Sequence, residues 1–179
     1  MSNYKEFYDR AVGKLKGLPV SKDTFCPLPF SHISTMPHGE IKLCCRAQPP
    51  MDGVNPNVKN EDFNLKDYWH SEYMNDIRDD LILGNKPPQC SNCWKMEDND
   101  IVSLRMNRLT DLMDKDTYRK PVEHYLINRE VEFKIPLIEL KLSNVCNFKC
   151  RMCWPKDSSK WVTDWDKVKQ FYSRNSRWK

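Results

Sequence analysis

Eight cysteines constrain this chain more than any other feature, and they form two sets along its 179 residues. The first set is Cys26, the pair Cys44 and Cys45, and Cys90 with Cys93; the second is Cys146, Cys150 and Cys153. The polar segment 1–22 lacks the apolar core of a secretory signal, and no apolar run reaches the roughly 18 residues of a membrane span. We therefore expect a cytoplasmic protein whose clustered cysteines bind metal instead of forming disulfides.

The second set is a C-x3-C-x2-C array on a loop that follows an apolar strand. Three thiolates this close in sequence can bind three corners of a cuboidal iron-sulfur cluster, which leaves one iron without a protein ligand. Chemistry at a metal requires such an open position, as it does in catalytic zinc sites. The alternatives are a structural zinc site and buried free thiols.

The first set predicts a closed site with four ligands. Cys26 is followed by twelve residues, Gly39, four residues and Cys44, and Cys90 and Cys93 form a separate Cys-x-x-Cys knuckle. Four thiolates suit either a 4Fe-4S cluster or tetrahedral zinc, and spacing alone does not choose between them. Cys44 fits the glycine spacing better than Cys45, so we leave Cys45 without a ligand role.

The pattern of apolar and turn residues predicts an α+β organisation. We expect helices over 4–15, 71–83, 101–112 and 157–172, a hairpin over 25–45 that turns at Gly39, a loop over 46–62 and a strand over 135–142. The hairpin brings Cys26 close to Cys44. The charged segment 113–134 is expected to be an irregular linker.

The stretch from Leu142 to Cys153, with sequence LSNVCNFKCRMC, resembles the signature of radical S-adenosylmethionine (radical SAM) enzymes. The resemblance implies that Cys146, Cys150 and Cys153 hold a 4Fe-4S cluster whose open iron chelates S-adenosylmethionine. The reduced cluster then splits this cofactor to methionine and a 5'-deoxyadenosyl radical. Met152 stands beside the adenine, where the family usually has an aromatic residue, and this departure weakens the adenine contact.

Residues 24–105 resemble the twitch or SPASM-like modules that carry an auxiliary cluster in some radical SAM enzymes. The matching stretches are Cys26–Phe30, Gly39–Cys45, Ile77 with Arg78, Gly84, and Cys90–Trp94 with Glu97. This resemblance implies a second, auxiliary 4Fe-4S cluster, with zinc as the alternative metal, held by Cys26, Cys44, Cys90 and Cys93.

The two resemblances divide the chain into an N-terminal helix and extension (1–23), an auxiliary-cluster module (24–112), a linker (113–134) and the start of a radical SAM barrel (135–179). Residues 135–179 have room for one strand-loop-helix unit of an incomplete (β/α) barrel, because each unit takes about 30 residues. We expect the chain alone to be an inactive part of the enzyme, either a fragment or one half of a split enzyme.

The resemblance implies hydrogen abstraction from a peptide or a small molecule. The expected partners are a low-potential electron donor and, if the enzyme is split, a completing chain. The alternative is a non-catalytic module that binds zinc or an iron-sulfur cluster. Residues 141–179 carry ten Lys or Arg against three Asp, but no nucleic-acid motif accompanies this charge, so we expect neither nucleic acid nor membrane as partner.

Several other residues are weaker candidates. His32 and His38 are potential zinc ligands but are expected to be structural or solvated, and Glu97 is expected to form a local ion pair. Trp161 and Trp165 are expected to pack against the sheet, and Lys149 and Arg151 to be solvated loop charges beside the cluster.

Overall fold

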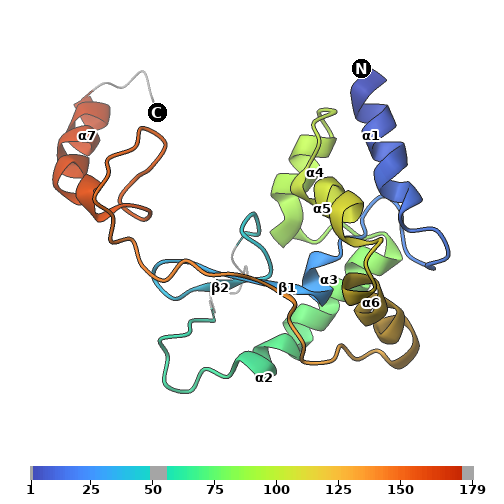
Figure 1. Ribbon diagram of the computed structural model, residues 1–179. Helices are drawn as coiled ribbons and strands as arrows, with labels where there is room; N and C mark the ends of the chain where they lie inside the picture. The colour runs from blue at the N-terminus through green and yellow to red at the C-terminus, as the bar shows by residue number, and fades with distance from the viewer. Residues whose placement is uncertain (1, 49–55, 175–179) are drawn as a thin grey trace.

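The computed structural model describes residues 2–48 and 56–174, so part of the predicted loop 46–62 lies outside the described residues. The helices are α1 (Ser2–Gly13), α2 (Leu65–Trp69), α3 (Glu72–Leu83), α4 (Ser91–Glu97), α5 (Leu104–Leu112), α6 (Asp116–Asn128) and α7 (Val162–Arg174). The strands are β1 (His32–Thr35), β2 (Ile41–Lys42) and β3 (Leu137–Glu139). Helices α1 and α3 to α6 gather at one side of the sheet, and α7 lies apart from them at the end of a long arm (Figure 1).

The strands form one sheet with the order β2-β1-β3. The hairpin predicted over 25–45 is present: β1 pairs antiparallel with β2, with Ser34 opposite Lys42. All four residues of the central strand β1 are buried, and β3 pairs parallel to it with His32 opposite Leu137. The sheet therefore joins the hairpin of the first cysteine set to the strand that precedes the second.

Gly39 allows the hairpin to turn, because it has a φ of +91°. A Cβ atom there would lie 2.3 Å from Oδ1 of Asn57 and 2.9 Å from Cγ of Lys59. We expect Gly39→Ala to lower the free energy of unfolding by about 1–3 kcal/mol, because backbone strain and contact act together. Gly13→Ala is the matched control, since a Cβ atom there meets nothing within 4 Å. Chemical denaturation of both variants checks this, and an equal effect would contradict it.

Capping residues set the ends of helices α3 and α5. Ser71 caps α3 by accepting a hydrogen bond from the Met74 amide, and Gly84 ends the helix at a φ of +100°. Ser103 caps α5 by accepting from the Met106 amide. The prediction of a helix over 71–83 is thus confirmed, while the helix predicted over 101–112 begins three residues later, after its cap.

The segment 113–134, predicted to be an irregular linker, instead forms helix α6 over most of its length. Its charged residues and Pro121 obscure the helical period in the sequence. Val122 and Tyr125 are buried in the core, and Tyr118 and Leu126 pack against it at the spacing of one helix face.

The strand predicted over 135–142 is shorter, because only Leu137–Glu139 pair in the sheet. Leu140 and Leu142 are exposed. A loop and then α7 follow, so the predicted order of strand, loop and helix is present. Among the described residues no helix has the length and apolar character that crossing a membrane requires.

Candidate metal centre

One small cavity is lined by four cysteines of the first set: Cys26, Cys44, Cys90 and Cys93. The rest of its wall is apolar apart from two arginines: Leu28, Leu43, Ala47, Leu104, Trp94, Arg46 and Arg105. The predicted approach of Cys26 to Cys44 is therefore confirmed. A cavity bordered by four soft sulfur donors and no other metal-binding side chain has the donor chemistry of an iron-sulfur site.

Hydrogen bonds hold the two halves of this cavity together. Cys44 follows β2, and Cys93 lies in the first turn of α4. The side-chain amide of Asn92 donates to the Arg46 carbonyl oxygen at 2.7 Å, and the Gln48 amide donates to the Gln89 carbonyl oxygen at 2.8 Å. The hairpin end and the Cys-x-x-Cys knuckle are thereby fixed side by side, although more than forty residues separate them in sequence.

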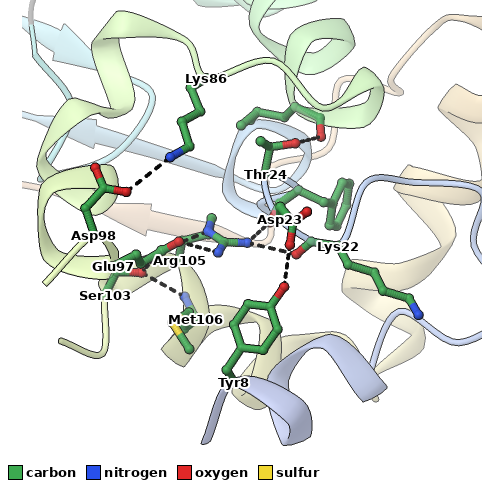
Figure 2. Close-up of polar contacts among 12 residues, drawn as sticks. Tyr8, Lys22, Asp23, Thr24, Lys86, Glu97, Asp98, Ser103, Arg105 and Met106 are labelled. Carbon is green, nitrogen blue, oxygen red and sulfur yellow. Dashed lines mark hydrogen bonds and ion pairs between the residues drawn. The ribbon is translucent and has the colours of Figure 1, made fainter. Parts of the chain in front are cut away.

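Two buried arginines hold the chain on either side of Cys26. Arg78 of α3 donates from Nε to the Pro29 carbonyl oxygen at 2.9 Å, and its guanidinium lies over the Trp69 ring. Arg105 of α5 donates from Nη1 to the Phe25 carbonyl oxygen at 3.1 Å (Figure 2). Both hydrogen bonds are buried, so they fix the backbone that presents the Cys26 thiol.

Arg78 was predicted only as part of the resemblance, and Arg105 was not predicted as a site residue. A signal was present in both cases, because each arginine falls on the apolar face of its helix. Arg78 lies four residues after Met74 and three before Leu81, and Arg105 lies four before Leu109. A charged residue at a core position indicates a buried polar partner.

Burial holds the thiols of Cys26, Cys44 and Cys90 in the protonated form. It raises the pKa of Cys26 and Cys90 well above the ordinary value, and it raises the pKa of Cys44 to about 12. The neighbouring cysteines raise these pKa values further, which reflects how close the thiols are. A metal bound here must displace these protons, so its binding releases them.

Cys45 does not line the cavity and is half-buried. Burial is the main reason why the pKa of its thiol is raised, and a hydrogen bond with the Glu139 side chain of β3 raises this pKa further. His32 is buried with Nδ1 3.0 Å from the Leu43 carbonyl oxygen, and His38 is exposed. Neither histidine lines the cavity, so the structure leaves the four cysteines as its metal-binding side chains.

The second set lies on the arm between β3 and α7. Cys146 and Cys153 are half-buried and Cys150 is exposed. Desolvation raises the pKa of the Cys153 thiol, and the charges of Cys150, Asp157 and Cys146 add to the effect. The Phe148 amide also donates to the Cys146 sulfur at 3.5 Å. All three predicted ligands are thus on one tight loop.

The residues before α7 hold this loop in place. Buried Ser158 donates from Oγ to the Phe148 carbonyl oxygen at 2.7 Å, and the Cys146 amide donates to Ser159 Oγ. Trp161 donates from Nε1 to the Cys150 carbonyl oxygen at 3.1 Å. The expectation that Trp161 and Trp165 pack against the sheet is wrong, because α7 lies away from the sheet (Figure 1). Trp161 instead bonds to the loop, and the Trp165 ring lies 6.3 Å from that of Trp154.

Other side chains of the second loop face solvent or pair locally. Met152, predicted to stand beside the adenine of the cofactor, is 97% exposed. Lys149 forms an ion pair with Asp164 of α7, and Arg151 is exposed. Among the described residues no three His, Cys, Asp or Glu side chains meet as ligands of a single metal ion. This holds for both cysteine sets: the first four cysteines line a cavity, and the other three lie on an exposed loop.

Residues 26–94 match the family model of SPASM, an iron-sulfur cluster-binding domain. The match begins at Cys26, contains Cys44 and Cys90, and ends one residue after Cys93, so it includes all four thiols of the cavity. Iron-sulfur cluster binding in this region is thereby supported by two independent observations. No curated protein and no solved structure matches the chain.

Proposed function

We propose that this chain is part of a radical SAM enzyme, with an auxiliary 4Fe-4S cluster in the first cysteine site and a cofactor-binding cluster at the second. The observation that carries the proposal is the cavity lined by Cys26, Cys44, Cys90 and Cys93, within the region that matches the cluster-binding family. The C-x3-C-x2-C loop joined to the same sheet through β3 supports the second half of the proposal.

The residues of the first site fit an enclosed cluster. Four thiols leave no iron open, and the apolar wall around them excludes water, which favours electron transfer over ligand exchange. Arg46 and Arg105 border the cavity and offset the negative charge of the thiolates. The site would relay electrons or help to close the active site.

The residues of the second site fit a cluster with one open iron. Cys146, Cys150 and Cys153 would be its ligands, and Ser158, Ser159 and Trp161 would fix the loop backbone. When bound, the cluster and S-adenosylmethionine would supply reductive cleavage to a 5'-deoxyadenosyl radical. Cys150 and Met152 are exposed, so a cofactor could reach this part of the loop.

A second candidate is one half of a split enzyme that a partner chain completes. Exposed apolar side chains are concentrated along the arm: Ile138, Leu140, Leu142, Val145, Phe148, Met152 and Trp154. β3 is also an edge strand, because it pairs on one side with β1 alone. A partner strand beside β3 would cover this surface.

Anaerobic reconstitution with iron and sulfide tests the proposal. We expect about eight irons per chain, and a change in the electron paramagnetic resonance spectrum of the reduced protein when S-adenosylmethionine is added. Cys150→Ala should abolish this response and keep the first cluster, since the two sites share no ligand.

The other outcomes separate the alternatives. One zinc per chain without iron uptake would contradict the radical SAM proposal and favour a structural zinc module. Iron uptake without a response to the cofactor would favour the split enzyme, in which the partner chain supplies the remaining cofactor contacts.

A further inference from the structure

Arg105 occupies an unusual position in the first cysteine site. It is only 2% exposed, yet it borders the cavity together with the four thiols. Its Nη1 donates to the carbonyl oxygens of Phe25, at 3.1 Å, and Lys22, at 3.4 Å. One guanidinium therefore connects α5 to the segment that leads directly into Cys26.

Glu97 fixes the other side of this guanidinium. Arg105 donates from Nε to Glu97 Oε1 at 2.9 Å, and Nη2 forms a close ion pair with Oε2 (Figure 2). The hydroxyl of Ser103 donates to the same carboxylate and also caps α5. Glu97 ends α4, one turn after Cys93, so the Arg105–Glu97 pair joins the two chain segments that present Cys26 and Cys93.

The guanidinium of Arg105 lies next to the thiols. It borders the same cavity as Cys26, Cys90 and Cys93. Arg105 also lies 5.5 Å from the Trp94 ring centroid. Arginine stays protonated in proteins, so this positive charge is permanent. Glu97 does not line the cavity, so the positive end of the pair is the end nearer the thiols.

We propose that Arg105, held by Glu97, positions Cys26 and raises the reduction potential of the cluster in the first cysteine site. This inference rests on the proposed function, because it requires a cluster there. One-electron reduction adds a negative charge to the cluster, and a cation at the cavity wall stabilises that charge. The charge is buried, so solvent screens it little.

The experiment measures the midpoint potential of the first cluster in the full-length chain. Cys146, Cys150 and Cys153 are all replaced by alanine in the background, so that only the first cluster remains. In this background Arg105→Met removes the cation, Glu97→Gln removes its counter-charge, and the double variant leaves a neutral pair. Arg119→Met is the matched control, since Arg119 also pairs with a glutamate and donates to two backbone carbonyl oxygens, but away from the cavity.

We expect the potential to rise in Glu97→Gln and to fall in Arg105→Met, with the double variant between the wild type and Arg105→Met. A fall that makes reduction tenfold less favourable corresponds to about 59 mV. Arg119→Met should leave the potential unchanged. A purely structural role would cost iron occupancy in both single variants without shifts of opposite sign.

The outcomes separate this inference from the proposed function. No iron in the background chain would overturn both. Iron with equal potentials in all variants would overturn the role of Arg105 and leave the cluster assignment intact. If Arg105→Met fails to fold, the Glu97→Gln variant decides, because a potential that stays constant or falls contradicts the proposal.

Discussion

Cys44→Ala is expected to remove the cluster of the first site and lower the iron content from about eight to about four per chain. Cys44 is 7% exposed and lines the cavity with the other three thiols. Its loss leaves three thiols in an enclosed, mostly apolar cavity that offers no replacement for the fourth ligand, whereas the exposed loop of the second site can take its fourth ligand from the cofactor. Iron analysis and the absorption near 400 nm of the reconstituted protein measure this effect.

Cys45→Ala is the matched control, because it makes the same chemical change at the next residue. Cys45 lies outside the cavity and interacts with Glu139, so its replacement should keep about eight irons. Equal iron loss in the two variants, or greater loss in Cys45→Ala, would contradict the assignment of Cys44 as the ligand.

Phe30→Ala is expected to lower the free energy of unfolding by about 3–5 kcal/mol. Phe30 is fully buried in the turn after Cys26 and packs against the rings of Phe25 and Tyr125, with centroids 5.7 and 5.4 Å away. This loss is large compared with the total free energy of unfolding of a typical domain, which is roughly 5–15 kcal/mol. The Cys26 segment would also lose its contact with α6, so weaker cluster retention should accompany the loss of stability.

Thermal and chemical unfolding, followed by circular dichroism under anaerobic conditions, measure the change. Phe133→Ala provides the comparison, because Phe133 is 43% exposed and its replacement should change stability by no more than about 0.5 kcal/mol. Similar stabilities of Phe30→Ala and the wild type would show that the turn after Cys26 is not anchored by this ring.

Local features of the sequence predicted local structure well. Ser71 and Gly84 mark the two ends of α3, and Gly39 marks the turn of the hairpin. Each of these signals depends on the backbone preference of one residue or on a hydrogen bond three residues away. Helix α6 was missed because its apolar positions are few and its charged residues dominate the pattern.

Such local signals could not predict which distant segments α5 and β3 contact. Arg105 meets Phe25 from eighty residues away, and β3 pairs with a strand more than a hundred residues earlier. The local spacing of residues predicts neither contact, since both depend on how the whole core packs. A short apolar strand also carries no information about which strand it joins.

The sequence by itself determined which side chains of this protein are candidates for binding a cluster. The number, type and spacing of the cysteines predicted a four-thiol site and a three-thiol loop, and the match of residues 26–94 to an iron-sulfur cluster-binding domain supports the first. The tertiary structure places Cys44, which glycine spacing already favoured, at the cavity and leaves Cys45 outside it. Only the tertiary structure brought the hairpin end and the Cys-x-x-Cys knuckle together, because the hydrogen bonds that join them connect residues more than forty positions apart. It also placed Arg105 and Glu97 at that site, since a buried charge finds its partner through the fold and not through the order of residues.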